Sequence, residues 1–441
     1  MNIQNVNNIQ SGENINKACF NTLLEREGLN YTMNDDFLLV GTQPSEHDRI
    51  VYISVIRPQM WDLLVILVPQ LASLELTFQM VKDVVVAETV MSGLMGDNNI
   101  GKVILFFIPA NRDFGEIIKK LIDLTQRFKG PAVPGEKHLG GLLYLNVQRI
   151  GIKSSNSKSG YKKCTIFKKK YLVISTLKQD GKGDVYKALY FKTFMRLAKC
   201  VIKEGKRLML ADEYGRDIKH RLEWQVKIQK ELFGIIHIPE VIDLFESDGN
   251  IYFVMEFIKG KPLTHKINSI YNLRRWLQLS GKEKIELFDL FLQLINSLEK
   301  IHQRGYVHRD LSPLNFLVNE GGQLNIIDME LAYNVNIKYP LPPFGVGTRG
   351  FMSPEQRAFK VPTMKEDIFG LGSLMIGFFA NLPAAKYDFD NLDQIRNDMF
   401  SSTGNLQVAE LIVSCLNESP DQRPELHEIK NVMVSWRDNC I

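Results

Sequence analysis

The stretch that decides the fold is His308-Arg309-Asp310-Leu311-Ser312-Pro313-Leu314-Asn315. Four residues separate Asp310 from Asn315, and a second aspartate, Asp328, ends an apolar run further downstream. A carboxylate can accept a proton from a hydroxyl group, and carboxylate and amide oxygens are suitable ligands for Mg²⁺. These residue types therefore make Asp310 a candidate proton acceptor and Asn315 and Asp328 candidate metal ligands.

Further motifs follow one another along the last two thirds of the chain. They are a glycine-containing loop (181–186), a strand ending in a lysine (200–203), an apolar strand (251–257), and the segments 347–355, 367–372 and 421–424. Their order resembles that of the protein-kinase fold. The resemblance implies a bilobal kinase that uses ATP and Mg²⁺ and transfers the γ-phosphate to a Ser or Thr hydroxyl.

The resemblance also assigns roles to individual residues. Asp310 and Lys203 are the expected catalytic residues, and Lys203 would hold the α- and β-phosphates of ATP. Asp367 would anchor the catalytic loop, and Arg423 would form a salt bridge with Glu355. The implied ATP-binding residues are Gly181, Gly183, Val185, Lys203, Gln225, Glu256 and Phe257.

Several positions depart from the common kinase pattern. Lys178 and Asp180 stand where the first two glycines of the loop usually lie, so the backbone should wrap phosphates less closely. Gln225 occupies the place of the glutamate that pairs with the strand lysine, and it can hydrogen-bond Lys203 but cannot neutralise it. Ser312 replaces a lysine, and Asp328-Met329-Glu330 replaces the usual DFG. These departures leave open a pseudokinase that binds without catalysis.

The departures resemble one family in particular. Residues 310–315, 327–332 and 347–351 are similar to the kinase domain of class III and IV lanthipeptide synthetases. That resemblance implies phosphorylation of Ser and Thr in a ribosomally made precursor peptide with a leader, followed by elimination in a separate N-terminal lyase domain. The C-terminal cyclase of that family has no counterpart after Arg423, so separately encoded lyase or cyclase proteins are expected partners.

The first 150 residues resemble the lyase domain in order and spacing. Expected elements are a strand at 50–55, helices at 61–74 and 114–128, and a strand at 103–109. Ile53 and Gln79 fall where the lyase has its acid and base, and neither can exchange protons near neutral pH. Lys82, Lys102 and Lys137 are the remaining candidates for binding phosphate in this domain.

Composition and length agree with a two-domain enzyme. The chain of 441 residues carries a net charge of +4, which does not indicate nucleic acid as a partner. Its five scattered cysteines include no CxxC pair, which favours reduced thiols, and no apolar run suits a membrane span. A cytoplasmic protein is therefore expected, and the resemblance to lanthipeptide synthetases implies a bacterial one.

The predicted fold class is α+β, with a small α/β lyase-like domain followed by a bilobal kinase. The predicted boundaries are a lyase-like domain at 1–150, a linker at 151–170, a kinase N-lobe at 171–258 and a C-lobe at 259–441. Two other functions stay open: a general bacterial Ser/Thr protein kinase, and a pseudokinase scaffold that binds peptide. Phosphate transfer to candidate peptides would distinguish the scaffold from both kinases.

Overall fold

The computed structural model of the chain describes residues 19–42, 45, 48–91, 95–147, 165–193, 196–345 and 347–440. Most of the predicted linker, residues 151–164 with Cys164, lies outside these ranges. The expected mixture of helices and strands is confirmed. The chain forms two compact units: Met1–His220 with Phe245–Phe253, and Arg221–Leu244 with Val254–Ile441. In the described ranges, no helix is long and apolar enough to cross a membrane.

The first domain, which comprises the described residues up to 147, is built on a seven-stranded sheet. Its strand order is β1 (Tyr31–Met33), β2 (Phe37–Val40), β4 (Phe78–Val81), β5 (Ile104–Ile108), β3 (Arg49–Ile53), β7 (Leu143–Leu145) and β6 (Lys137–Gly140). Each neighbouring pair is antiparallel. The small domain is therefore α+β and not α/β, because α/β domains are built on parallel strands joined by helical crossovers.

Four helices accompany this sheet: α1 (Asn21–Arg26), α2 (Met60–Ser73), α3 (Val84–Met91) and α4 (Phe114–Thr125). The helices predicted at 61–74 and 114–128 and the strands predicted at 50–55 and 103–109 are confirmed, with ends that differ by one to three residues. Helix α4 begins where the Asp113 carboxylate accepts a hydrogen bond from the Glu116 amide, 3.0 Å away. Apolar residues of α2 and α4 pack with Phe78 and Phe106 in one buried core.

A second sheet of six strands has the order β12 (Val241–Ser247), β13 (Asn250–Glu256), β11 (Arg196–Gly205), β10 (Val185–Thr193), β9 (Tyr171–Lys178) and β8 (Ile166–Phe167). Strand β8 lies inside the range predicted as linker, which corrects that boundary. The turn after β8 has positive φ at Lys168 and Lys169, both 52°, and Lys170 N donates to Phe167 O. No glycine or asparagine marks this turn, so its residue types do not predict it.

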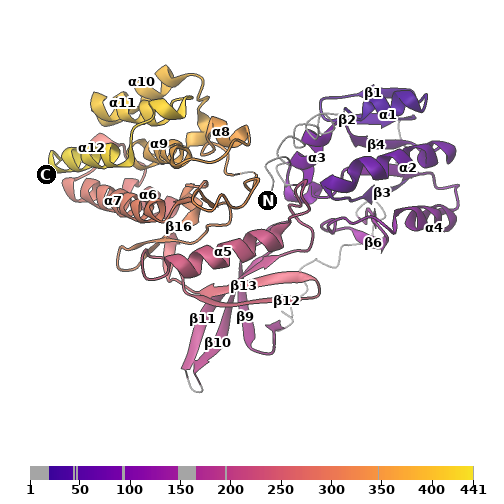
Figure 1. The fold of residues 1–441 in the computed structure, drawn as a ribbon, viewed down its shortest axis with the longest axis horizontal. Helices are drawn as coiled ribbons and strands as arrows, with labels where there is room; N and C mark the ends of the chain where they lie inside the picture. Colours follow the sequence, from indigo (N-terminus) through magenta and orange to yellow (C-terminus); the bar gives the residue numbers. More distant parts are fainter. Residues whose placement is uncertain are drawn as a thin grey trace, which may run out of the picture. The chain divides into compact units, whose positions relative to one another are not determined.

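The second unit is largely helical (Figure 1). Its helices are α5 (Ile218–Leu232), α6 (Leu263–Tyr271), α7 (Gly281–Gln303), α8 (Pro354–Arg357), α9 (Met364–Ala380), α10 (Leu392–Thr403), α11 (Leu406–Cys415) and α12 (Leu426–Asp438). Aromatic rings on α7, α9 and α12 meet at the centre of its core, where Phe288, Phe379 and Trp436 lie with centroids 4.9–5.5 Å apart. Such packing gives the unit a rigid frame.

Short strands place the catalytic loop on this frame. Strands β14 (Gly260–Pro262), β16 (Phe316–Asn319) and β17 (Leu324–Ile326) form an antiparallel sheet, and β15 (Tyr306–Val307) pairs with β18 (Tyr333–Asn334). Residues 308–315 run between β15 and β16. Both ends of the loop are therefore fixed by strand pairing.

Candidate active site

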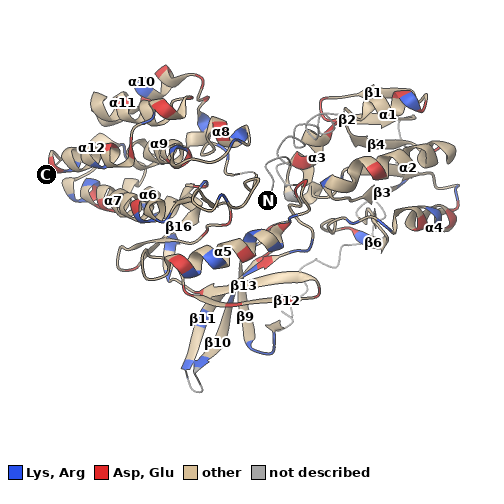
Figure 2. Ribbon diagram, viewed as in Figure 1, with Lys and Arg blue, Asp and Glu red and all other residues tan. Residues whose placement is uncertain are grey.

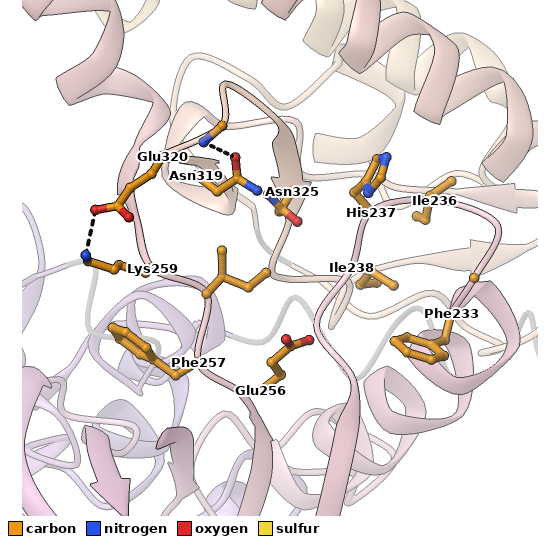
Figure 3. Close-up of a pocket in the computed structure, with 13 residues that line it drawn as sticks. Phe233, Ile236, His237, Ile238, Glu256, Phe257, Lys259, Asn319, Glu320 and Asn325 are labelled. Carbon is orange, nitrogen blue, oxygen red and sulfur yellow. Dashed lines mark hydrogen bonds and ion pairs between the residues drawn. The ribbon is translucent and has the colours of Figure 1, made fainter. Parts of the chain in front are cut away.

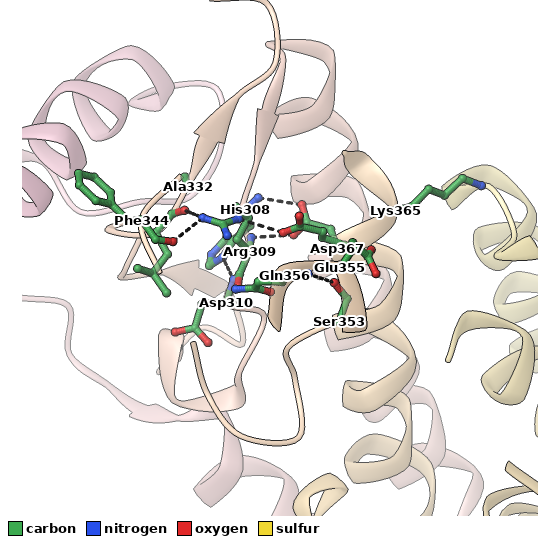
Figure 4. Close-up of polar contacts among 12 residues, drawn as sticks. His308, Arg309, Asp310, Ala332, Phe344, Ser353, Glu355, Gln356, Lys365 and Asp367 are labelled. Atoms are coloured by element: carbon green, nitrogen blue, oxygen red, sulfur yellow. Dashed lines mark hydrogen bonds and ion pairs between the residues drawn. The ribbon is translucent and has the colours of Figure 1, made fainter. Parts of the chain in front are cut away.

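Asp367 holds the backbone of the catalytic loop in place through hydrogen bonds. Its carboxylate accepts hydrogen bonds from the amides of His308 and Arg309, each at 2.8 Å, and lies 2.8 Å from Nε2 of His302 (Figure 4). Helix α9 carries Asp367, so the loop is attached to a helix most of whose residues are buried. The role predicted for Asp367 from the sequence is confirmed.

Asp310 contacts the two segments that flank the site. Its Oδ2 accepts a hydrogen bond from Nδ2 of Asn315 at 2.8 Å, and its Oδ1 accepts one from the Thr348 amide at 3.2 Å. Burial raises the pKa of the Asp310 carboxyl above its ordinary value, although these hydrogen bonds act in the opposite direction. A carboxylate of this kind is oriented by its neighbours and is more basic than one in water.

Asp328 lies beside the same loop. Asp310, Asn315 and Asp328 line the same narrow crevice. The amide nitrogen of Asn315 is committed to Asp310, so its amide oxygen is the donor atom that can face a cation. One amide oxygen and one carboxylate form a hard-oxygen donor set that fits Mg²⁺, which usually binds proteins through few side chains and keeps the rest of its ligands as water or phosphate.

His308 supports the loop without being exposed to solvent. Its Nδ1 accepts a hydrogen bond from the Asp310 amide at 3.3 Å, and burial lowers the pKa of its imidazole. A neutral His308 therefore suits the acceptor role at Nδ1. Because the ring is 1% exposed, it serves the geometry of the loop and does not meet substrate.

The predicted salt bridge between Glu355 and Arg423 is also confirmed. Two nitrogens of Arg423 lie 2.6 and 2.8 Å from the two carboxylate oxygens of Glu355. Both residues are buried, and the same guanidinium donates to the Asn417 and Lys365 carbonyls. A bidentate buried pair fixes the end of the segment that begins at Asp328 relative to the loop that precedes α12.

Lys203 and the glycine-containing loop lie in the first unit. Lys203 is buried on β11, opposite Val185, which begins β10 directly after the loop. Gly183 has φ of +149°, and a Cβ there would lie 2.0 Å from the Glu204 carbonyl oxygen. Gly183 is therefore required by its close approach to β11. Gly181 precedes it in a turn whose Asp180 and Gly181 carbonyls accept hydrogen bonds from Lys206.

The other predicted ATP-binding residues lie in the second unit. Gln225 on α5 is fully buried, and its Nε2 donates to the Ile327 carbonyl at 3.3 Å, one residue before Asp328. Glu256 ends β13, Phe257 follows it, and both line a pocket of about 510 Å³ (Figure 3). Loop 233–238 and the β16–β17 turn complete this pocket, and Lys259 and Glu320 form an ion pair at its edge. Of the residues that line this pocket, the sequence predicted only Glu256 and Phe257 as ligand-binding.

The three lysines predicted to bind phosphate in the first domain have separate surroundings. Lys82 contacts the Asp35 carbonyl, and Lys137 is exposed on β6. Lys102 lies 2.8 Å from Oε1 of Glu136, and its side chain is only 15% exposed. The amine of Lys102 also lies over the Tyr52 ring at 4.4 Å. A carboxylate already neutralises Lys102, which weakens the case for phosphate binding there. The role stays a prediction.

Comparisons with known proteins agree with this geometry. The family described as Protein kinase domain matches residues 175–434. The interferon-induced, double-stranded RNA-activated protein kinase of Mus musculus is 30% identical over 182 residues, which are 38% of this chain and 33% of the mouse protein. Serine/threonine-protein kinase B of Synechocystis is 28% identical over 184 residues, 39% of this chain and 30% of that protein.

A viral relative is covered over more of its length. A putative serine/threonine-protein kinase of Acanthamoeba polyphaga mimivirus is 27% identical over 232 residues, which are 48% of this chain and 81% of the viral protein. By contrast, the chain spans about a third of the mouse and cyanobacterial kinases.

Proposed function

Because this chain belongs to the protein kinase family, we propose that it transfers the γ-phosphate of ATP to a Ser or Thr hydroxyl of a protein or peptide. The observation that carries the proposal is the position of Asp310. Asn315 and the Thr348 amide fix both oxygens of its carboxylate, and Asp328 lines the same crevice. Orientation of this kind is what a general base needs.

In this proposal Asp310 orients the acceptor hydroxyl and accepts its proton at a carboxylate oxygen. The raised pKa of Asp310 makes it a better proton acceptor than an exposed aspartate. Lys203 would hold the α- and β-phosphates of ATP, and Asn315 and Asp328 would hold Mg²⁺. The ion, when bound, supplies positive charge that offsets the charge on the phosphates.

The direct experiment is phosphate transfer from radiolabelled ATP in the presence of Mg²⁺ to a mixture of Ser, Thr and Tyr peptides. Asp310→Asn and Asp328→Asn should each lower turnover by roughly a hundredfold or more. Lys203→Ala should abolish ATP use, and Lys282→Ala, at an exposed site on α7, serves as the control. Equal turnover by wild type and Asp310→Asn would refute the proposal and favour a scaffold that binds without catalysis.

A narrower second candidate concerns the acceptor. The similarity of residues 310–315 and 347–351 to lanthipeptide synthetases makes a ribosomal precursor peptide the acceptor to test. An additional N-terminal domain with a defined core of its own supports a role in gripping such a peptide. Candidate precursor peptides and unrelated proteins are each incubated with the protein, ATP and Mg²⁺, and mass spectrometry shows which of them gain phosphate. Phosphorylation of unrelated proteins alone would favour a general Ser/Thr protein kinase.

A further inference from the structure

The segment that touches the catalytic carboxylate carries an unpaired arginine. The Thr348 amide donates to Asp310, and Arg349 is the next residue, with consecutive Cα atoms about 3.8 Å apart. Arg349 is exposed and has no hydrogen-bond or ion-pair partner in the described part of the chain. An acceptor hydroxyl that reaches Asp310 therefore brings its neighbouring residues close to the segment that carries Arg349.

The backbone at this position is held in place. Gly350 has φ of +88°, and a Cβ there would lie 2.8 Å from the backbone nitrogen of Ala385. Ala385 belongs to the short helix η6 (Ala384–Lys386), so the chain after Arg349 packs closely on another element. Only glycine fits this conformation and this distance. The position of Arg349 is thus fixed on both sides, by Asp310 through Thr348 and by η6 through Gly350.

The longer segment 331–363, which contains Arg349, is basic. Residues 331–363 contain four cationic side chains, all exposed and without an ionic partner in the ranges that the structure describes: Lys338, Arg349, Arg357 and Lys360. Its one acidic residue, Glu355, is buried and paired with Arg423. Figure 2 shows the blue of basic residues at α8, which carries Arg357. The exposed surface of this stretch is therefore positive, which attracts acidic chains.

Residues 308–315 of the catalytic loop, all of which the structure describes, include no exposed carboxylate that could balance that charge. Leu314, next to Asn315, is an apolar side chain that is 64% exposed. The two aspartates beside it, Asp310 and Asp328, line the catalytic crevice and are needed there. A basic substrate would find no exposed carboxylate on these two segments. An acidic one would find Arg349.

We infer that the acceptor Ser or Thr is flanked by acidic residues, either Asp and Glu or residues that already carry phosphate, and that Arg349 is the residue that selects them. The inference rests on the proposed function and adds the substrate class. An arginine side chain spans about two residues of an extended peptide, so the acidic group should lie within about two positions of the acceptor. Guanidinium pairs well with carboxylate and with phosphate.

The test uses the full chain and three Ser peptides that differ only at the two positions on each side of the acceptor, which are Glu, Ala or Lys. For the wild type we expect kcat/KM for the Glu peptide to exceed that for the Lys peptide by about tenfold or more. Arg349→Lys should keep this preference, Arg349→Ala should remove it and Arg349→Glu should reverse it. Lys282→Glu, an equal charge reversal at an exposed site on α7, should change nothing.

The outcomes separate this inference from the proposed function. If the wild type phosphorylates none of the peptides, no other protein and not itself, the proposed function is refuted. If it phosphorylates them without charge preference, or if Arg349→Glu keeps the preference for Glu, the inference about Arg349 is wrong and the kinase assignment stands. Thermal unfolding of each variant shows whether a lost activity reflects a lost fold.

Discussion

Arg309 and Glu366 form an ion pair that is fully buried, with Nε of Arg309 2.9 Å from Oε2 of Glu366. The same guanidinium donates to the carbonyls of Leu331 and Phe344, at 3.2 and 2.8 Å, in the segment between Asp328 and Glu355. A carboxylate on α9 therefore supplies the negative charge that faces Arg309. The segment is held to the catalytic loop without a phosphate group.

This pair predicts that activity does not depend on phosphorylation of the segment 328–355. Arg309 is 3% exposed and already has an anionic partner, so an added phosphate would gain little from it. We expect protein treated with a phosphatase, which is then removed, to keep its initial rate at pH 8 within about twofold of untreated protein, since no charge-assisted bond is lost. Mass spectrometry confirms that phosphate is absent. A loss of most of the activity, restored by ATP preincubation, would contradict the prediction.

Glu366 should also make stability depend on pH. Burial, aided by the nearby Asp367 and Glu355 carboxylates, raises the pKa of Glu366 to about 7, against 4.5 for an ordinary glutamate. The folded state then holds a proton that the unfolded state releases. The contribution is complete below about pH 4.5 and is lost as the pH rises through 7, a change of about 3 kcal/mol in the free energy of unfolding.

Urea unfolding at several values between pH 5 and pH 8 measures this change. Glu366→Gln removes the titrating group, so the difference in stability between wild type and variant should shift in favour of the variant as the pH rises. Glu299→Gln, at a partly exposed ion pair on α7, is the control and should give a nearly constant difference. Parallel curves for wild type and Glu366→Gln would show that Glu366 does not titrate in this range.

The motifs predicted what depends on spacing. The loop 308–315, its anchor Asp367 and the Glu355–Arg423 pair follow from residue types at set intervals, and the structure places them together. Hydrogen-bond partners that depend on how helices pack were not predictable. Glu366 is the sequence neighbour of Asp367, and its contact with Arg309 depends on how α9 packs against the loop. The turn at Lys168 and Lys169 was missed because its residue types disfavour positive φ.

Gln225 shows how a contact changes an expectation. As a residue type in place of glutamate, it suggests that Gln225→Glu should be tolerated or should improve ATP use. In the structure its Nε2 donates to the Ile327 carbonyl, and the side chain is fully buried. A glutamate cannot donate this hydrogen bond and places a charge in the interior, at a cost of about 1–3 kcal/mol. We expect Gln225→Glu to lower the melting temperature by several degrees.

The matched control is Glu223→Gln, the reverse chemical change at an exposed position on the same helix, which should leave the melting temperature nearly unchanged. Differential scanning fluorimetry without and with ATP and Mg²⁺ measures both variants. A melting temperature for Gln225→Glu equal to that of the wild type would mean that the Ile327 contact contributes nothing to stability.

The first domain should leave phosphorylated peptides intact. Elimination needs a base for the α-proton and an acid for the leaving group. Ile53, where the lyase resemblance places the acid, is a fully buried apolar residue on β3, and Gln79 on β4 has no proton to exchange near neutral pH. Lys102 is occupied by Glu136. We therefore expect a synthetic phosphoserine peptide, incubated with the Lys203→Ala variant, to keep its mass unchanged.

We expect that variant to lack kinase activity, so any loss of phosphoric acid would come from the first domain. Such a loss would show that other groups do the proton transfer, and Glu136→Gln, which frees Lys102, is the variant that would then separate a catalytic lysine from a structural one.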